Sequence, residues 1–403
     1  MPIPFFIRKN ILYKFQPYAN MKTNMKRFTK RFMKGDGKME DIKKILEQAT
    51  VPELPKRKDY RIGIIGAGFI VKGCHLVAYQ KAGFYPYAIT SKSGIHAKEA
   101  AEEFNIPNVY DTWKELIDDE QVEILDIAVP PHVQLDIVRY ACTKKHIKGI
   151  LCQKPIAMST EDAKEIARLG EEADIKIAVN ANMRYDQSMM ALKKILDEGW
   201  IGDRVIATID MRATPDWQGF LKEYDNKLEL YAMAVHHIDI FRYLFGDPEK
   251  ITCVCRTDPR TKFQHVDGIT QYTFQYSDGM LATSLDDVWA WPEEPCEKDN
   301  YIRFRVEGTE GFAEGEIGWH KRAPEFCGST LKLASKQFPN QWIEPTWDTM
   351  WFPDAFVGTM ANLLIAVETD IDPKISAKDY VGTMACVEAC YQSIQEERSV
   401  RLK

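Results

Sequence analysis

The stretch that decides the fold is Tyr60-Arg61-Ile62-Gly63-Ile64-Ile65-Gly66-Ala67-Gly68-Phe69-Ile70. Its isoleucines predict a short buried strand, and residues 70–79 follow with the pattern of a helix. Gly66 permits a tight turn and Gly68 permits close approach of a ligand, because neither carries a Cβ atom. The first turn of the helix, with Phe69 and Ile70, is then expected to bind a dinucleotide pyrophosphate. Val71 stands where glycine or alanine is usual, so a tight turn that binds nothing is the alternative.

Length and composition narrow the class of protein. The chain has 403 residues, 45% of them hydrophobic and 28% charged, which predicts a globular protein of two domains. A net charge of −6 argues against general nucleic-acid binding. No apolar run reaches the roughly 18 residues of a membrane span. Nine cysteines without a Cys-x-x-Cys pair favour reduced thiols in a cytoplasmic protein over disulfides or a metal site.

Residues 1–58 are interpreted as a basic N-terminal extension and linker, with a short helix expected at residues 41–48. The first 38 residues hold ten Lys and Arg and one acid. They are either a basic tail that touches membrane or nucleic acid, or translated upstream DNA. The second interpretation is preferred, because Lys34-Gly35-Asp36 can be encoded by a sequence that resembles a bacterial ribosome-binding site just before Met39. N-terminal sequencing of the natural protein distinguishes the two.

Residues 59–180 alternate between short apolar strands and helices, which predicts a Rossmann domain, a doubly wound parallel sheet with helices on both faces. Strands are expected at residues 62–65, 85–90, 108–110, 123–129, 148–152 and 175–180. Helices are expected at residues 70–79, 95–104, 113–117, 132–145 and 160–173. Ligands of such sheets bind beyond the C-terminal ends of the strands.

The end of the second strand is where such domains distinguish NAD from NADP. An NAD site usually has an acid there, about 20 residues past the glycines. Here Ser91 and Lys92 occupy the place, and both can bind a 2′-phosphate. The cofactor is therefore expected to be NAD or NADP, with a weak preference for NADP. An equally good interpretation is a solvated turn that does not distinguish the two cofactors.

Gln153-Lys154-Pro155 follows the fifth strand, so Lys154 is expected near the nicotinamide. Partial burial and the cationic ring would lower the pKa of its ammonium toward working pH, as an acid/base group requires.

Residues 181–403 change to strands without long helices between them, which fits an antiparallel sheet. Strands are expected at residues 204–212, 251–256, 269–276, 280–285, 301–307, 311–316 and 330–335. Helices are expected at residues 188–196, 354–369 and 377–398.

His236 is the second candidate catalytic residue. It shares a helix face with Asp239, which is expected to orient its ring. His237 projects about 100° away and is interpreted as packing, and no third ligand supports a metal site. Five further residues follow strand ends and are expected to line a substrate pocket, although packing or surface placement explains each equally well. These are Arg184, Tyr185, Arg212, Asp216 and Trp217.

From Tyr60 to Leu402 the chain resembles the Gfo/Idh/MocA oxidoreductase family. The resemblance rests on Gly66-Ala67-Gly68, Val129-Pro130-Pro131-His132, Gln153-Lys154-Pro155, the His236 segment and Trp351-Phe352-Pro353-Asp354-Ala355-Phe356. It implies a Rossmann domain joined to a C-terminal α/β domain with an open, mainly antiparallel sheet. It also implies that Val129, Pro130, His132, Gln153 and Lys154 contact the cofactor, and that His236 and Asp239 face the substrate. Gln153 replaces the family's glutamate, and Ala232 replaces an aspartate that many relatives carry one turn before the histidine.

The resemblance implies an NAD(P)-dependent dehydrogenase that acts on a hydroxyl group of a sugar, polyol or glycoside. Either Lys154 or His236 accepts the hydroxyl proton while the other orients it. The alternatives are a glycosidase or lyase that oxidises its sugar transiently, and a dinucleotide sensor without catalysis. By analogy with the family, a homodimer or homotetramer is expected.

Overall fold

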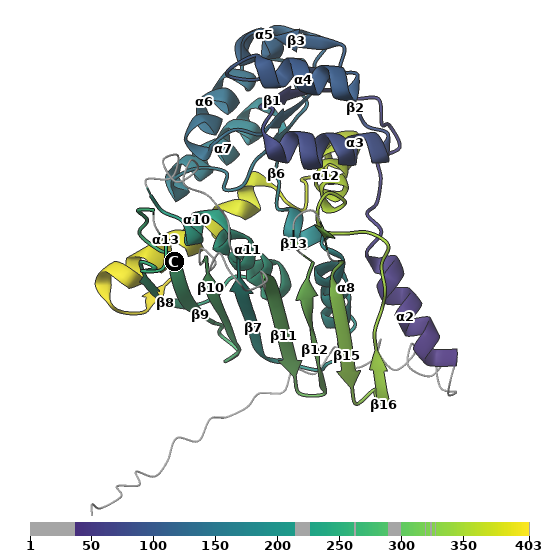
Figure 1. Ribbon diagram of the computed structural model, residues 1–403, viewed down its shortest axis with the longest axis vertical. Helices are drawn as coiled ribbons and strands as arrows, with labels where there is room; N and C mark the ends of the chain where they lie inside the picture. Colours follow the sequence, from purple (N-terminus) through teal and green to yellow (C-terminus); the bar gives the residue numbers. More distant parts are fainter. Residues whose placement is uncertain are drawn as a thin grey trace, which may run out of the picture.

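The computed structural model describes residues 37–213, 226–261, 263–288, 300–318, 320–322, 325–326 and 328–402. The basic segment 1–36 therefore lies outside the described residues. Two large sheets organise the chain, a six-stranded one formed by the N-terminal half and a nine-stranded one formed by the C-terminal half (Figure 1). The predicted fold class is confirmed by this pair of sheets, although the exact domain boundaries stay a prediction.

The first sheet is parallel throughout, with the order β3-β2-β1-β4-β5-β6. Its strands are β1 (Arg61–Ile65), β2 (Tyr85–Thr90), β3 (Asn108–Tyr110), β4 (Ile124–Ile127), β5 (Gly149–Cys152) and β6 (Lys176–Val179). The strands β1, β4, β5 and β6 are almost wholly buried, as their runs of apolar residues predict for a sheet covered on both faces. The strand order reverses between β1 and β4, so a ligand is expected at their C-terminal ends.

Helices cover both faces of this sheet. They are η2 (Val71–His75), α3 (Leu76–Ala82), α4 (Ile95–Phe104), α5 (Trp113–Asp118), α6 (Pro131–Ala141), α7 (Thr160–Ala173) and α12 (Ala355–Thr369). The expected helix at residues 70–79 is in fact a π-helical turn followed by α3, and the one at 132–145 ends four residues early. On one face Gly63 of β1 lies against Leu116 of α5, and on the other Gly149 of β5 lies against Leu363 of α12. The helix α12 thus comes from the C-terminal half and packs on the N-terminal sheet (Figure 1).

The second sheet has the order β16-β15-β12-β11-β7-β10-β9-β8-β17, in which only β7 and β10 pair in parallel. Its strands are β7 (Arg204–Arg212), β8 (Lys250–Arg256), β9 (Ile269–Gln275), β10 (Leu281–Asp287), β11 (Tyr301–Gly308), β12 (Gly311–Ile317), β15 (Thr330–Ser335), β16 (Phe338–Ile343) and β17 (Val400–Arg401). A separate small pair joins β13 (His320–Arg322) and β14 (Glu325–Phe326). The edge strands β16 and β17 were not predicted. The sheet is open and mainly antiparallel, as expected.

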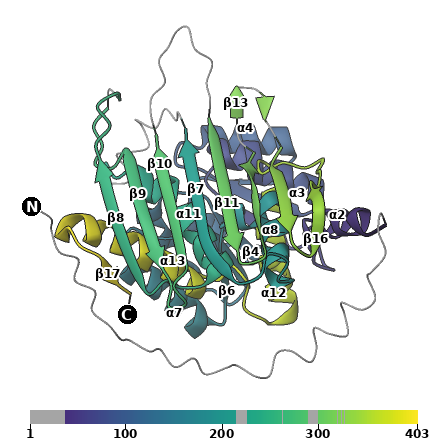
Figure 2. The ribbon, with the colours of Figure 1, turned by 90° about the horizontal axis from the view of Figure 1, so that it is seen from below.

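Helices lie on one face of the second sheet and leave the other uncovered in the described residues (Figure 2). The remaining helices are α2 (Gly37–Ala49), η3 (Asn182–Tyr185), α8 (Gln187–Asp197), α10 (Glu229–Ala232), α11 (Ala234–Phe245) and α13 (Ala377–Glu396). The expected helix at 41–48 is α2, which begins earlier and packs against α8 and β16. No helix among these residues is both long and apolar enough to cross a bilayer.

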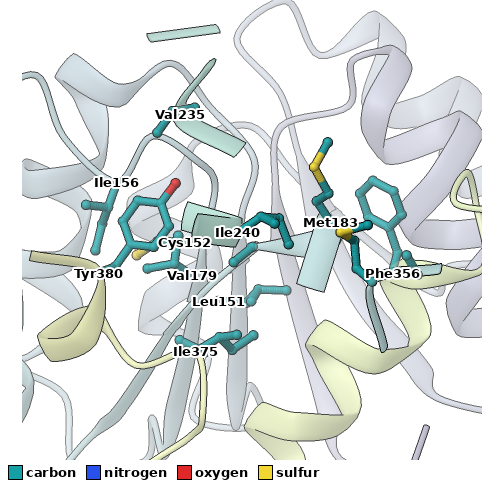
Figure 3. Packing of buried hydrophobic residues seen from close by; sticks show 14 of the residues in the cluster. Leu151, Cys152, Ile156, Val179, Met183, Val235, Ile240, Phe356, Ile375 and Tyr380 are labelled. Atoms are coloured by element: carbon teal, nitrogen blue, oxygen red, sulfur yellow. The ribbon is translucent and has the colours of Figure 1, made fainter. Parts of the chain in front are cut away.

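A shared core joins the two halves. Leu151, Cys152 and Val179 at the ends of β5 and β6 are buried beside Val235 and Ile240 of α11 (Figure 3). Met183 of η3 and Phe356 of α12 close the same cluster, as do three further labelled residues, Ile156, Ile375 and Tyr380. Because interiors of this kind are close-packed, the strand end that precedes Lys154 and the helix that carries His236 are held at a defined distance.

Candidate active site

The glycine turn after β1 has the geometry of a backbone ligand site. Gly66 has φ +113°, and a Cβ atom there would lie 2.3 Å from the Ala128 carbonyl oxygen. A Cβ atom at Gly68 would meet nothing within 4 Å, so this residue opens onto free space. Phe69 beside it is 75% exposed. The turn therefore fits a dinucleotide that approaches the backbone closely, with Val71 buried in the packing behind it.

The residues after β2 bear no carboxylate between Thr90 and Gly94. The Ser91 hydroxyl accepts a hydrogen bond from the Ala97 N–H group at 3.2 Å, which ties the loop to the first turn of α4. Lys92 is exposed at the same strand end. A cation and a hydroxyl thus stand where an acid would be needed to bind ribose hydroxyls.

The residues after β4 lie beside the glycine turn. The Ala128 N–H group donates to the Ile65 carbonyl at 2.8 Å, which brings this strand end to β1. Val129 and Pro130 follow it half-buried, and His132 in the first turn of α6 is exposed. The structure therefore places them at the predicted edge, and their contact with a cofactor stays a prediction.

Lys154 leaves the end of β5 and reaches the C-terminal half. Its ammonium donates a hydrogen bond to the Ala232 carbonyl oxygen at 2.6 Å. The Ala232 carbonyl can accept this bond because α10 ends at Ala232. The His236 N–H group, which would bond it in a continuous helix, donates to the Met233 carbonyl instead. Burial lowers the pKa of Lys154 to about 8, against the opposing charge of Glu229. The amine can therefore exchange a proton near neutral pH.

His236 lies four residues beyond the carbonyl that binds Lys154. Its ring is 4% exposed and packs edge-on against Trp351 at 5.8 Å between centroids. Burial, and then the charge of Lys154, lower its pKa well below the usual value, so the imidazole is neutral. The Trp351 indole N–H group donates to Asn182 Oδ1 at 2.9 Å, which fixes the indole. The two predicted catalytic side chains thus lie at one junction between the sheets.

Arg184 and Asp239 bind each other rather than facing an open pocket. The Arg184 guanidinium donates to both oxygens of Asp239, at 2.7 and 2.6 Å, and to Asp379 at 2.6 Å. Thr383 donates to Asp239 as well, at 2.9 Å. The expectation that Asp239 orients the His236 ring is not supported, because its oxygens are directed to these partners. The pair instead ties η3 and α11 to α13.

Arg212 is directed away from the junction. Ser284 and Asp286 of β10 face α11, since Asp286 accepts from His237 at 2.9 Å. Arg212 pairs in register with Asp287, the next residue, so it lies on the opposite face of the sheet. Within one chain the structure therefore does not bring Arg212 to Lys154 and His236.

The other predicted substrate residues have mixed outcomes. Tyr185 is half-buried, with its ring against Gly358 of α12. Asp216 and Trp217 lie outside the described residues.

Gln134 contacts the backbone beside Lys154, and the sequence analysis did not single it out. Its amide oxygen accepts from the Gln153 N–H group at 2.7 Å, and its amide nitrogen donates to the carbonyls of Gln153 and Pro155, at 3.0 and 2.9 Å. It therefore holds the backbone on both sides of Lys154 from α6. A polar residue on the otherwise apolar face of a helix was the available signal. In the residues that the structure describes, no group of three or more His, Cys, Asp and Glu side chains is arranged to hold a metal ion.

Comparisons with known proteins show which proteins the chain resembles. By sequence, the chain is 26% identical over 341 residues to the D-apiose dehydrogenase of Rhizobium rhizogenes, covering 84% of this chain and 96% of the relative. It is 29% identical over 293 residues to the levoglucosan dehydrogenase of Pseudarthrobacter phenanthrenivorans, covering 63% and 73%. By structure, a levoglucosan dehydrogenase in complex with NADH and levoglucosan superposes with a TM-score of 0.73 at 22% identity, over 86% of this chain and 99% of that one.

Two family matches divide the chain at the boundary between the sheets. Residues 60–181 match the oxidoreductase family with an NAD-binding Rossmann fold, and residues 189–314 match the C-terminal domain of the same family. The two matched segments contain β1 to β6, and then α8 with β7 to β11. The chain belongs to the Gfo/Idh/MocA family of NAD-binding oxidoreductases.

Proposed function

We propose that the protein is an NAD(P)-dependent dehydrogenase that oxidises a hydroxyl group of a sugar, polyol or glycoside. The observation that carries the proposal is the hydrogen bond from Lys154 to Ala232, which joins the cofactor half to the end of α10, just before the helix of His236. The relatives named for D-apiose and levoglucosan support a sugar-like substrate.

The pKa directions assign different tasks to the two side chains. The nicotinamide supplies a hydride acceptor when it is bound. Lys154, with a pKa of about 8, takes the proton of the substrate hydroxyl, because a base works best when its pKa lies near the operating pH. The neutral His236 imidazole accepts or donates a hydrogen bond and orients the hydroxyl. Trp351 keeps this ring in place.

The decisive experiment identifies the nucleotide and the substrate together. The purified protein is heat-denatured, the released nucleotide is identified by mass spectrometry, and absorbance at 340 nm is followed over a panel of sugars and polyols. We expect reduction of the added cofactor with at least one polyhydroxy compound. Tight nucleotide binding without turnover on any member, or sugar cleavage without net reduction, would overturn the proposal.

The cofactor is proposed to be NADP rather than NAD, because Lys92 and Ser91 stand where an acid would be needed for NAD. Lys92→Ala is expected to raise the KM for NADP about tenfold and to leave the KM for NAD unchanged, since an exposed charge-assisted bond to phosphate contributes about 1.4 kcal/mol. Lys98→Ala, on the exposed side of α4, is the matched control. Equal effects on both cofactors would contradict the assignment.

The uncovered face of the second sheet is proposed to bind another copy of the chain. Exposed apolar side chains on it include Ile206, Val254 and Leu281, and the first and last are paired in register. Analytical ultracentrifugation is expected to find a dimer or tetramer, and Ile206→Lys is expected to weaken it. A monomer at micromolar concentration would contradict this proposal.

A further inference from the structure

A buried polar network lies behind Lys154 on the side of the first sheet. Its members are Gln153 beside Lys154, His75 in η2, Asp126 in β4 and Asn180 after β6. His75 and Asp126 are each 1% exposed and Asn180 is fully buried. The His75 Nδ1 atom lies 2.7 Å from Asp126 Oδ2, and its Nε2 atom lies 3.1 Å from the Asn180 amide nitrogen. The network thus connects Asp126 in β4 to the Gln153-Lys154-Pro155 segment after β5.

The orientation of the Gln153 amide follows from the backbone. Its Oε1 atom accepts a hydrogen bond from the Lys154 N–H group at 2.9 Å, and a backbone N–H group can only donate. The nitrogen end of the amide must therefore face His75, at 3.5 Å from Nε2. Asn180 brings a second amide nitrogen to the same atom.

The position of the proton on the His75 ring follows from the two donors that face its Nε2 atom. Because the Gln153 and Asn180 nitrogens both donate, His75 Nε2 must be the acceptor and carries no proton. The ring proton then lies on Nδ1, which donates to Asp126. The Tyr79 hydroxyl donates to the same carboxylate oxygen at 2.7 Å.

We propose that His75 is a positioning residue for Lys154, and that Gln153 and the neutral Nδ1–H form of His75 work as a matched pair. The pair holds the Lys154 backbone without placing an acid beside it. This proposal rests on the proposed function only in so far as Lys154 is the proton-handling group.

Replacing the amide by a carboxylate shows why the pair is matched. In Gln153→Glu one oxygen still accepts from the Lys154 N–H group, and the other faces the lone pair of His75 Nε2. That contact requires a second proton on the ring, so His75 would become an imidazolium between the new acid and Asp126.

The charges that already face these groups come from few elements. Lys154 faces Glu229 of α10 and His236 of α11. His75 faces Asp126 of β4 and Tyr79 of α3, and the Phe356 ring of α12 covers it at 5.1 Å. Gln153→Glu therefore adds an acid directly beside Lys154, on the side where Asp126 lies beyond His75.

The test is NMR on the full-length protein, labelled with ¹⁵N in histidine and ¹³C in lysine. The His75 signals are assigned by their loss in His75→Gln, and the Lys154 signal by its loss in Lys154→Arg. In the wild-type protein at pH 7 we expect a protonated Nδ1 and a bare Nε2 atom at His75. This measurement needs no substituted protein beyond the assignment.

The same spectra then compare two substitutions that each add one negative charge. Gln153→Glu is expected to protonate His75 Nε2 at pH 7 and to raise the Lys154 midpoint by about one pH unit. Gln80→Glu, on the exposed side of α3, is the matched control and is expected to change neither. A proton on Nε2 in the wild-type protein, or unchanged titration of both groups in Gln153→Glu, would overturn the proposal.

Activity provides a separate readout. If the protein is a dehydrogenase, the acid limb of its kcat profile moves to higher pH by the same amount in Gln153→Glu. If no substrate is found but the NMR result holds, the matched pair stands and the proposed function fails. A profile that stays in place while the NMR midpoint moves removes Lys154 as the proton acceptor.

Discussion

The two halves of the molecule surround Lys154 in different ways. On the side of the first sheet, the Gln153 amide accepts from the Lys154 N–H group, and the Gln134 amide binds the backbone of the two neighbouring residues. On the side of the second sheet lie buried acids, Glu229, Asp267 and Asp286, each fully buried. Both carboxylate oxygens of Glu229 lack a hydrogen-bond partner among the described residues. The first half thus positions the backbone at Lys154, and the second half places acids on the side of its ammonium.

This difference shows how the chain meets two opposed requirements. A base must be held rigidly, and many close contacts achieve that only if they are satisfied. It must also lose and regain a proton, which requires a tuned environment. Burial, followed by the charges of Asp286 and Asp267, raises the pKa of Glu229 well above its usual value. The charge of Glu229 in turn opposes the lowering of the Lys154 pKa by burial.

The largest expected effect is a loss of turnover when the Lys154 amine is replaced. Lys154→Ala is expected to lower kcat by about 10²- to 10⁴-fold, the range for a general base, with cofactor affinity retained. Lys154→Arg keeps the positive charge but cannot deprotonate, so it should lose as much. In the wild-type protein the rate of alcohol oxidation should fall as pH decreases below about 8. Steady-state kinetics and cofactor titration measure these effects, and near-normal turnover of either variant would contradict them.

The next largest effect is expected on stability, when the buried ion pair between Arg184 and Asp239 of α11 is removed. Arg184→Leu leaves Asp239 buried without its main partner, which is expected to lower the free energy of unfolding by about 3–5 kcal/mol. Arg139→Leu is the control, because its pair with Glu165 is exposed and worth about 0–1 kcal/mol. Urea unfolding measures both. Similar losses in the two variants would show that burial does not matter here.

Glu229→Gln removes the carboxyl group on the second-sheet side of Lys154 and keeps a side chain of nearly the same shape. The folded-state pKa of this carboxyl is raised, so the unfolded chain releases the proton first and folding becomes less favourable as pH rises. The glutamine variant should therefore be more stable than the wild-type protein at pH 8, and the difference should vanish toward pH 4.5. Each unit of such a shift corresponds to about 1.4 kcal/mol. Unfolding midpoints at several pH values measure this.

The same substitution removes the opposing charge from Lys154, so the pKa of Lys154 should move below about 8. Glu344→Gln, exposed after β16, is the control for both readouts. A stability difference that does not depend on pH would mean that Glu229 is not the buried acid described here.

The contrast between the halves also explains what the sequence could predict. β2, β3 and β7 were located to the residue, and β4, β5 and β6 to within one or two residues at each end, because turn residues bound their apolar or alternating runs. The edge strand β16, Phe338–Ile343, is polar and mostly exposed, and its sequence carries no such pattern. Local patterning was therefore sufficient where a strand has an apolar or alternating run between turns.

The site depended on contacts that local patterns do not encode. The partners of Arg184 lie 55 and 195 residues away, so its buried ion pair could not be inferred from its position after a strand. Arg212 was expected to line a pocket from its place at a strand end alone, whereas the face it occupies depends on the register of β7 with β10. Lys154 and His236 could be singled out because each lies in a specific motif, at a strand end or near a helix start, and their catalytic roles stay a prediction.

The smallest expected effect lies in the first half but away from Lys154, and it tests whether local sequence determines stability there. Thr112 and Glu115 form a capping box at the start of α5, in which the Thr112 hydroxyl accepts from the Glu115 N–H group at 3.2 Å. Thr112→Ala should lower the free energy of unfolding by about 1 kcal/mol, while Thr112→Ser should keep nearly all of it. Neither should change kcat, because α5 packs behind β1 and not at its C-terminal end. A change in kcat in Thr112→Ala would show that the catalytic junction depends on more of the first domain than its own network.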